Sequence, residues 1–359
     1  MERLENRILF VWQGALTGNT NNAAHQYNNI ANWSSGAIED SFAGATFTAN
    51  TTLYFTGNHT TGAGGLNLGY TGNFSLTFMS STAATRTLTL GGNISAAPSG
   101  DTVTLGDVAG SDDLTIALGG NRTFTTASGQ TLAVVNIISG ASTLTAAGTG
   151  TLALSGVNTY SGGTTLSSGE LDINSAKALG AAAGALTING GTIDNTSGGA
   201  VTLANNNPQT WGSDFTFNGS NALNMGTGAV TLGANRILTV SGSTLTEGGI
   251  IGGAFSLAKA GAGTLTLTGA DTFSGGMTLT AGQLNINNAK SAGTGTFTIN
   301  GGTIDNTSGG AITFFSNNVE TWGADFTFIG TNALNFGTGA VTMSASRTVT
   351  VSGSTLTDG

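Results

Sequence analysis

The sequence predicts an all-β protein that folds as a right-handed parallel β-helix, or β-solenoid, with an N-terminal cap. Three observations lead to this prediction: short segments alternate polar and apolar residues, glycine-rich turns separate them, and a unit of about 111 residues occurs twice. Each coil of a solenoid packs only against its neighbours, so near-identical units are interchangeable there. In a closed sandwich the two copies would lie in different environments, and the repeat therefore favours the solenoid.

The first 40 residues differ from the rest of the chain. They lack the repeat and the threonine alternation, and they concentrate aromatic residues at Trp12, Tyr27 and Trp33. Because an open sheet edge recruits other strands, a solenoid must cover its first coil. We expect residues 1–40 to form that cap, with Asn21–Asn32 as the one helical candidate.

From residue 41 onward the chain has the pattern of strands and tight turns. Arg86–Leu90, Asp101–Leu105 and Thr264–Thr268 alternate polar and apolar residues, which directs every second side chain to the interior. Gly-Gly, Ser-Gly and Asn-Gly steps punctuate such segments and supply the positive φ values of sharp corners. We expect coils of about 20 to 25 residues, with Leu, Ile, Val and Phe inside and Thr and Asn at faces and corners.

Alignment of the chain with itself divides it into four regions. Residues 190–248 and 301–359 align without a gap at an offset of 111, with 43 identities in 59 positions. Upstream, residues 150–163 align with 263–276 at an offset of 113. The predicted regions are the cap (1–40), degenerate coils (41–145), a first repeat copy (146–258) and a second repeat copy (259–359).

The second copy stops in mid-pattern. It ends as Thr357-Asp358-Gly359, whereas the first continues from the equivalent position into Gly249-Ile250-Ile251. We expect either a fragment of a longer protein or a last coil that is left open. An open coil presents unpaired strand edges, so we also expect homo-assembly, end to end or lateral.

Both copies contain a glycine-rich motif with few charges. The second copy has KAGAGTLTLTGADTFSGG (Lys259–Gly276), and the first has NTYSGGTTL (Asn158–Leu166) but Ala146 at the position of Lys259. This pattern resembles the autotransporter-associated β-strand repeat. The segment LENRIL (Leu4–Leu9) resembles an element near the N-termini of large bacterial surface proteins. The resemblance implies a parallel β-helix exposed outside the cell, at the bacterial surface, as in adhesins.

The composition excludes several classes of function. Charged residues make up 8% of the chain and apolar residues 38%, unlike the charge-rich, apolar-poor composition of disordered chains. The net charge of −9 argues against a nucleic-acid partner, and the absence of cysteine excludes disulfides and thiolate metal sites. No apolar stretch is long enough for a transmembrane helix. Glu2 and Glu5 stand where a secretory signal needs positive charge, so the export route is not assigned.

A polysaccharide-binding or polysaccharide-cleaving β-helix is the main alternative, because parallel β-helices also host lyases and hydrolases. Glu170 and Asp172 are two positions apart on one strand face, as a carboxylate pair for acid–base work on a glycosidic bond would be. Their equivalents in the second copy are Gln283 and Asn285, and no basic residue lies close in sequence. We therefore expect a solvated surface pair.

Other catalytic and metal-binding motifs are missing. Each of the lysines follows an alanine, outside any phosphate-binding loop, and His25 and His59 have no second ligand at a recognisable spacing. Asp112-Asp113 lacks the companion motifs of pectin-degrading helices. We assign no catalytic, cofactor-binding or metal-binding residue and no cofactor, and we predict that the protein is not an enzyme.

Arginines recur at one place in the pattern. Arg86, Arg122, Arg236 and Arg347 each open a strand segment. We expect their guanidinium groups to cap carbonyl oxygens at coil corners or to meet an Asp of a neighbouring coil. The alternative is a repeated ligand contact.

Other repeated residues have a structural interpretation as well. Trp211 and Trp322 recur within Thr-Trp-Gly-x-Asp-Phe-Thr-Phe, and we expect them to pack at corners, with an aromatic platform for sugars as the alternative. A repeated set of aspartates fits turns better than catalysis: Asp194, Asp214, Asp305 and Asp325.

These observations predict a non-catalytic, extracellular, structural β-solenoid, such as a stalk, fibre or adhesin segment of a large bacterial surface protein. The expected partners are a second copy of the chain or host and cell-surface glycans, with no nucleic acid and no transmembrane segment. A further hypothesis is ice or surface binding through Thr-x-Thr ladders, which the irregular spacing of the turns disfavours.

Overall fold

The computed structural model describes residues 37–41, 45–46, 51–55, 59–67, 70–71, 76–80, 86–96, 102–106 and 114–359. These residues form strands and turns with no helix among them, which confirms the all-β class. Contacts divide the chain into an N-terminal unit, Met1–Gly162, and a C-terminal unit, Gly163–Gly359. Most of the predicted cap, including Leu4–Leu9 and Asn21–Asn32, lies outside the described residues, as do His25 and Asp112-Asp113.

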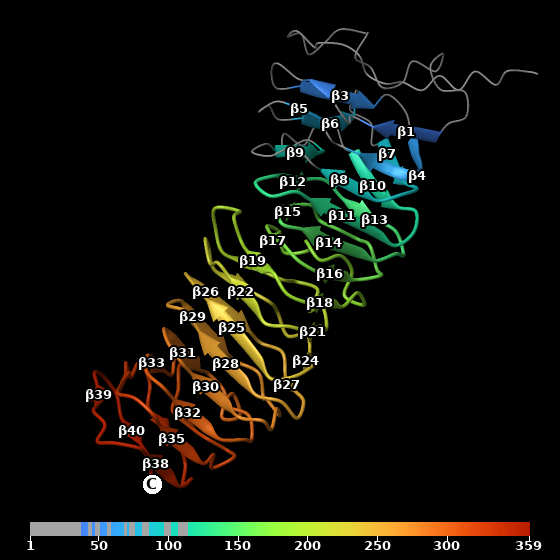
Figure 1. Ribbon diagram of the computed structural model, residues 1–359. Helices are drawn as coiled ribbons and strands as arrows, with labels where there is room; N and C mark the ends of the chain where they lie inside the picture. Colours follow the sequence, from blue (N-terminus) through green and yellow to red (C-terminus); the bar gives the residue numbers. More distant parts are fainter. Residues whose placement is uncertain are drawn as a thin grey trace, which may run out of the picture. The chain divides into compact units, whose positions relative to one another are not determined.

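Strands of the N-terminal unit stack in parallel on one another (Figure 1). One stack contains β3 (Thr51–Phe55), β6 (Leu76–Ser80), β9 (Thr102–Leu105), β12 (Thr131–Val134) and β15 (Thr151–Leu154). A second contains β1 (Ala37–Ser41), β4 (His59–Asn67), β7 (Arg86–Leu90), β10 (Leu114–Leu118), β13 (Ile138–Ser139), β8 (Ile94–Ala96), β11 (Arg122–Thr126) and β14 (Leu144–Gly148). The short strands β2 (Ala45–Thr46) and β5 (Tyr70–Thr71) pair with each other.

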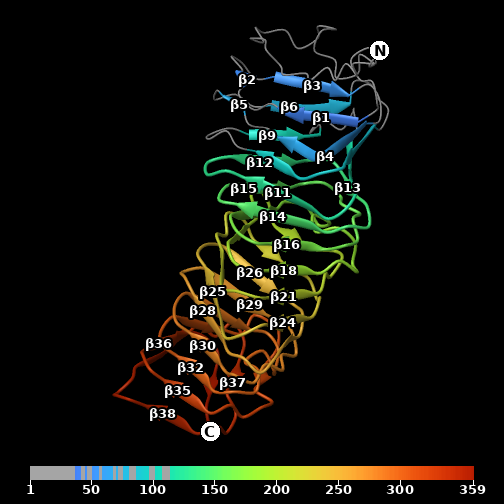
Figure 2. The same cartoon turned by 45° about the vertical axis from the view of Figure 1, so that its right-hand side comes forward.

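Strands of the C-terminal unit form four parallel stacks, here called sheets I to IV (Figure 2). Sheet I contains β16 (Thr164–Leu166), β18 (Leu186–Ile188), β21 (Gln209–Trp211), β24 (Val230–Leu232) and β27 (Ile251–Gly252). Sheet II contains β17 (Glu170–Ile173), β19 (Thr192–Asp194), β22 (Phe215–Phe217), β25 (Arg236–Val240), β28 (Leu257–Ala260), β30 (Met277–Leu279), β32 (Phe297–Ile299), β35 (Glu320–Trp322) and β38 (Val341–Met343). Sheet III contains β20 (Val201–Thr202), β23 (Leu223–Asn224), β26 (Thr244–Glu247), β29 (Thr264–Leu267), β31 (Gln283–Ile286), β33 (Thr303–Asp305), β36 (Phe326–Phe328) and β39 (Val349–Val351). Sheet IV contains β34 (Ile312–Thr313), β37 (Leu334–Asn335) and β40 (Leu356–Thr357).

Strand register gives the length of each coil. In the C-terminal unit paired residues are 19 to 24 positions apart, as between Leu265 and Leu284 or between Ile193 and Phe217. In the N-terminal unit the spacing reaches 30 positions between Ile94 and Phe124. Parallel strands stacked coil upon coil make both units β-solenoids, and the repeat-bearing unit has the shorter and more regular coils.

The two repeat copies use different sheets of the C-terminal unit. Strands β16, β18, β21 and β24 of the first copy lie in sheet I, but their equivalents β30, β32, β35 and β38 lie in sheet II. Likewise β17, β19, β22 and β25 lie in sheet II and their equivalents β31, β33, β36 and β39 in sheet III. The change occurs where β30 pairs with β28 and β31 pairs with β29. The second copy is therefore turned by one face of the solenoid relative to the first.

The core is formed by the inward side of the strands. Most three-residue strands bury their first and third residues and leave the middle one more exposed, as with Leu186, Thr187 and Ile188 in β18. Burying one such aliphatic side chain contributes about 1.5–3 kcal/mol to folding. The interior is lined with Leu, Ile, Val and Phe, which confirms the predicted distribution.

Glycine allows one coil to lie directly on the next. A Cβ atom at Gly228 would lie 2.1 Å from the carbonyl oxygen of Asn207, and one at Gly339 would lie 1.9 Å from that of Asn318. Real Cβ atoms do not approach this closely, so the same close contact requires glycine in both copies.

Candidate functional site

The glycine-rich motif of the second copy begins in β28 and includes β29, and its lysine lies inside the solenoid. Lys259 is fully buried, and its Nζ donates hydrogen bonds to the carbonyl oxygens of Ala260, Gly261 and Ala281 at 3.0, 2.7 and 3.1 Å. Burial lowers the pKa of Lys259 to about 8. Lys259 therefore closes a turn by satisfying three carbonyl groups. The sequence identifies this lysine as part of the repeat motif and does not indicate its burial.

The second charged residue of the motif, Asp271, is buried as well. Its Oδ1 accepts a hydrogen bond from the Ile251 backbone N–H at 2.8 Å, and its Oδ2 has no hydrogen-bond partner. Burial raises the pKa of Asp271 to about 8. The equivalent residue of the first copy, Asn158, accepts the Ile138 N–H at 2.7 Å in the same way. Asp271 thus occupies the place of an amide.

A polar cluster crosses the interior next to Trp211. Gln209 Nε2 donates to Glu247 Oε2 at 2.8 Å, and Gln209 Oε1 accepts from the indole Nε1 of Trp211 at 3.1 Å. The other oxygen of Glu247 accepts the Gly249 N–H at 2.9 Å. Burial, and to a smaller extent the nearby Asp271, raise the pKa of Glu247 to about 8.

The second copy has a carboxyl group where the first has Gln209. Glu320 Oε2 accepts the indole N–H of Trp322 at 2.7 Å, and Glu320 Oε1 is buried without a hydrogen-bond partner. Burial raises the pKa of Glu320 to about 7. Glu320 thus accepts the indole N–H of Trp322 as Gln209 accepts that of Trp211. An ionised Glu320 has no N–H group like the one that Gln209 donates to Glu247.

Glu170 and Asp172, the carboxylates considered for catalysis, make internal contacts. Asn218 Nδ2 donates to Glu170 Oε1 at 2.7 Å, and the Thr196 hydroxyl donates to Asp172 Oδ2 at 2.8 Å. Asp172 is only 5% exposed, and burial raises its pKa to about 6, so the expectation of a solvated pair was wrong for this residue. The described side-chain contacts of Arg236 lie at another corner, so that arginine does not join the two carboxylates.

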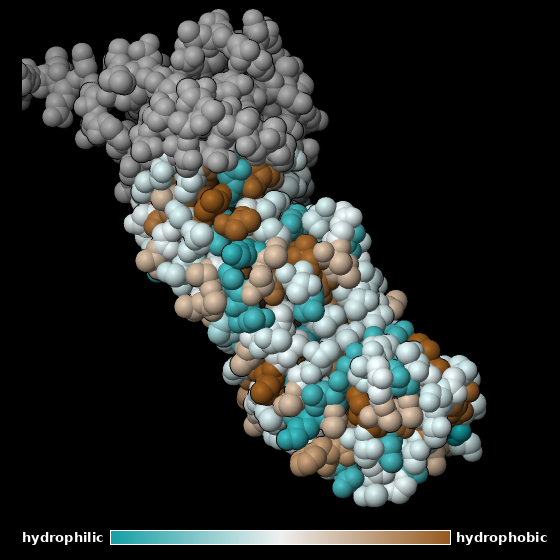
Figure 3. All heavy atoms as spheres, turned by 180° about the vertical axis from the view of Figure 1, so that it is seen from behind, coloured by the Kyte–Doolittle hydropathy of each residue, from teal (hydrophilic) through white to brown (hydrophobic). Residues whose placement is uncertain are grey.

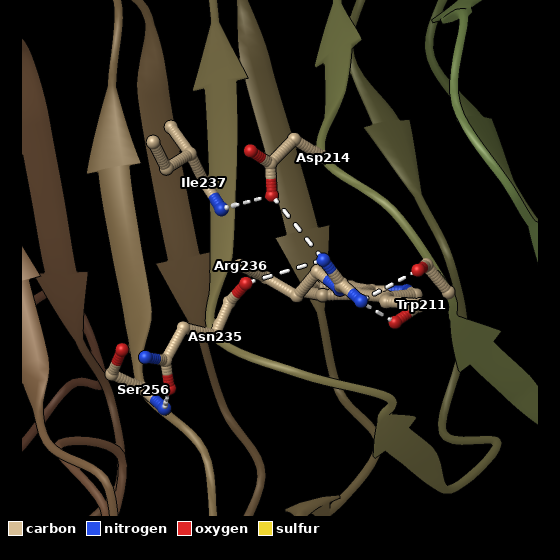
Figure 4. Close-up of polar contacts among 7 residues, drawn as sticks. Trp211, Asp214, Asn235, Arg236, Ile237 and Ser256 are labelled. Carbon is tan, nitrogen blue, oxygen red and sulfur yellow. Dashed lines mark hydrogen bonds and ion pairs between the residues drawn. The ribbon is translucent and has the colours of Figure 1, made fainter.

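Arginines cap carbonyl groups of the preceding coil, as predicted. Arg236 Nε donates to the Trp211 carbonyl at 3.0 Å and Nη2 to that of Gly212 at 2.5 Å, while Nη1 lies 3.7 Å from Asp214 Oδ1 (Figure 4). Arg122 Nε and Arg347 Nε donate to the carbonyl oxygens of Leu90 and Trp322 at 2.8 and 3.1 Å. These contacts stabilise corners, and the side chain of Arg86 lies outside those described.

Polar side chains also link the coils at the same corners. The Asp214 carboxylate accepts the Ile237 N–H, and the Asn235 side chain accepts the Ser256 N–H at 3.0 Å (Figure 4). Asp194 Oδ1 accepts the Asn195 and Ser220 N–H groups, each at 2.8 Å, and Asp305 makes the equivalent bonds. The repeated aspartates therefore hold turns, as expected.

The two repeated tryptophans pack against phenylalanines, Trp211 inside the solenoid and Trp322 with its side chain partly exposed. Trp211 is 1% exposed and packs edge-on against Phe215, with ring centroids 5.2 Å apart. Trp322 packs in the same way against Phe326. An aromatic platform for sugars at Trp211 is excluded by this burial.

The coloured part of the face seen in Figure 3 consists mainly of residues of intermediate hydropathy. Figure 3 shows them in pale colours, with small hydrophobic and hydrophilic patches between them. A single column of threonines runs along sheet I, with Thr165 paired to Thr187, Thr187 to Thr210 and Thr210 to Thr231. The flanking residues of these strands are buried, so the column is one threonine wide and does not form the Thr-x-Thr array that ice binding requires.

Metal or membrane features are not found in the described ranges. There, no three His, Cys, Asp or Glu side chains come together in a group suited to a metal ion. Nor do the described residues form a helix that could span a membrane.

Parallel coils, internal repeats and polar groups that bond within the coils define the class: a repeat-built parallel β-solenoid. The passenger-associated-transport-repeat family model matches residues 144–173 and 257–286, the segments that carry the predicted motif. These two segments are thus similar to passenger-associated transport repeats, which confirms the predicted resemblance at these residues.

One curated relative indicates the kind of protein in which such repeats occur. The Adhesin BmaC autotransporter of Brucella suis biovar 1 (strain 1330) is 36% identical over 95 residues, which cover 26% of this chain and 3% of the adhesin. The chain therefore aligns with a small part of that relative's length. No solved structure matches the chain.

Proposed function

We propose that this chain is a non-catalytic structural segment, a stalk, fibre or adhesin part, of a large bacterial surface protein located at or outside the cell surface. The main supporting observation is that the charged side chains of the repeats make hydrogen bonds within the fold. Lys259 bonds to carbonyl groups of its own turn and of the next coil, and Asp271 and Arg236 bond to backbone groups of the preceding coil. The match to an autotransporter adhesin supports the surface location.

Two measurements test this proposal. Bacteria that produce the natural protein are treated with protease, and we expect the segment to be removed from intact cells, because it is exposed outside them. The purified chain is then incubated with a panel of acidic polysaccharides, and we expect no new chain ends. Cleavage of any of them would overturn the non-catalytic role, and protection from protease in intact cells would overturn the location.

We further propose that a polypeptide of these 359 residues self-associates through its last coil. Met343 and Val351 are 53% and 49% exposed there, whereas the equivalent Leu232 and Val240 are 2% and 0% exposed under the following coil. Exposed apolar residues and unpaired strand edges favour pairing with another β surface. Cell-surface glycans are the second partner that we propose, through the outward faces.

Sedimentation velocity over a wide concentration range tests self-association. We expect larger species at high concentration, and we expect the double change Met343→Asp and Val351→Asp to remove them. Thr342→Asp, on the outward side of the same coil, is the matched control. A strictly monomeric wild-type chain at every concentration would overturn the proposal.

A further inference from the structure

Three buried carboxyl groups of the C-terminal unit share an unusual property. Asp172, Asp271 and Glu320 are each at most 5% exposed, and each has one oxygen without a hydrogen-bond partner. An ionised carboxylate in such a place would be costly, because burial removes water from a charge that no partner compensates. A protonated carboxyl group carries no charge, so its burial costs far less, and its O–H is a donor as the NH₂ group of an amide is.

The other repeat copy has an amide at each of these three positions. Asp172 aligns with Asn285, Asp271 with Asn158, and Glu320 with Gln209. A carboxylic acid has nearly the same shape as the amide, with an O–H in place of the NH₂ group. The acid can therefore replace the amide in the core only while it keeps its proton.

Hydrogen bonds show the correspondence for two of the pairs. Asp271 and Asn158 each use one side-chain oxygen to accept a backbone N–H, from Ile251 and Ile138. The unpartnered oxygen of Asp271 then corresponds to the amide nitrogen of asparagine.

The same holds for the glutamate. Glu320 and Gln209 each accept the indole N–H of the tryptophan two residues on, and the unpartnered oxygen of Glu320 corresponds to the Gln209 nitrogen that donates to Glu247.

Neighbouring charges act in the same direction as burial. Asp271 faces Glu247 of β26; Asp172 faces Glu170 on its own strand and Asp194 on β19; Glu320 faces Asp358 near the C-terminus. All these neighbours are acids, so they disfavour ionisation of the three carboxyl groups. The buried cation of the motif, Lys259, donates to backbone carbonyls.

We propose that Asp172, Asp271 and Glu320 are proton-bearing substitutes for the amides of the other repeat copy, so that the C-terminal unit becomes more stable as its surroundings become more acidic. The pKa values near 6, 8 and 7 set the window. A raised pKa means that the folded state holds protons that the unfolded state has released. Stability from each group is therefore fully present below its ordinary pKa near 4 and is lost as the pH rises through the raised value.

Urea unfolding of the full chain between pH 5 and pH 9 tests this proposal. For the wild type, each group lowers the folding equilibrium constant by up to about tenfold per pH unit between its ordinary and raised pKa. Asp271→Asn should remove the largest single part of that dependence. The triple change with Asp172→Asn and Glu320→Gln should leave only a smaller dependence, to which Glu247 still contributes because its pKa is also raised to about 8. The reciprocal change Gln209→Glu should add pH dependence while leaving the stability at pH 5 unchanged.

Asp325→Asn is the matched control, because this exposed side chain can still accept the Thr348 N–H through its amide oxygen. It should leave the pH dependence unchanged. Retention of the wild-type pH dependence by the triple variant, or lower stability of that variant than wild type at pH 8, would overturn the proposal.

A local measurement on the wild type does not depend on the variants. The Ile251 N–H bonds to Asp271, and its exchange requires the coils around that side chain to open. Because acid stabilises these coils, protection of this N–H from hydrogen exchange, corrected for the intrinsic rate, should rise on acidification from pH 8 to pH 6. Protection that stays constant or falls would contradict the role of Asp271.

Discussion

Buried residues of the two repeat copies differ in a coordinated way. The first copy buries Leu186, Leu203 and Met225, and the second buries a phenylalanine at each equivalent position. The three rings contact one another, with centroids 5.3 to 5.8 Å apart, as Phe297, Phe314 and Phe336. Acids and amides exchange between the copies as well. The corresponding strands nevertheless pair in the same order along each copy. Backbone contacts therefore define the path of each coil, and the buried side chains can differ between copies without changing that path.

Glycine substitutions test the backbone side of this comparison and should have the largest effect. In Gly228→Ala the new Cβ would lie against the Asn207 carbonyl, so we expect a loss of about 3 kcal/mol in the free energy of unfolding. Gly339→Ala has an equally close contact but lies near the last coil, where fewer contacts depend on it, so its loss should be smaller. Urea unfolding of both variants measures the difference.

Tolerance of Gly228→Ala, or equal losses at both glycines, would show that the close contact does not control coil stacking. Gly199→Ala is the control, because a Cβ there meets no atom within 4 Å. It should change stability little.

Replacing the buried phenylalanines of the second copy by the residues of the first copy tests how far the interior side chains depend on one another. Phe336→Met alone should cost about 1–2 kcal/mol, because it leaves space beside the other two rings. The triple change to Leu, Leu and Met at residues 297, 314 and 336 should cost less than the sum of the single changes, because residues in contact couple. Strict additivity in thermal unfolding would show that the three rings are independent.

Substitutions at the corner of Arg236 and Asp214 should include the smallest effect, which we expect at Asp214. Arg236→Ala removes hydrogen bonds to the carbonyls of Trp211 and Gly212, and we expect a loss of about 1–2 kcal/mol. Asp214→Asn should cost about 0–0.5 kcal/mol, because Asp214 is 53% exposed and the ion pair is screened by water. A loss at Asp214 as large as that at Arg236 would mean that the ion pair, rather than carbonyl capping, holds the corner.

Much of the fold follows from sequence patterns. Period-two alternation predicts strands such as Arg86–Leu90 and Thr264–Leu267, and the near-identical copies predict stacked coils. Arginines at strand starts predict carbonyl capping, because a guanidinium group offers several donors in one plane. These predictions succeed since they depend on local geometry that every coil repeats.

The buried charged residues could not be predicted in the same way. Lys, Asp and Glu are rarely buried, so their types indicate surface positions. Burial of Asp172 and Lys259 arises from the stacking of the next coil, which the alternation along one strand does not reveal. Comparison of the copies contains a usable signal, because acids that align with Asn or Gln mark sites where an uncharged group suffices.

The shift of the second repeat copy by one sheet determines which side of the solenoid carries each threonine column. The threonine column of the first copy lies on sheet I, and the equivalent Thr278, Thr298, Thr321 and Thr342 lie on sheet II. A flat partner that binds to sheet I would therefore contact the threonine column of the first copy alone. The equivalent column of the second copy lies on sheet II and faces another direction. Duplication of the sequence thus spreads one surface around the circumference, where separate molecules can reach each copy independently.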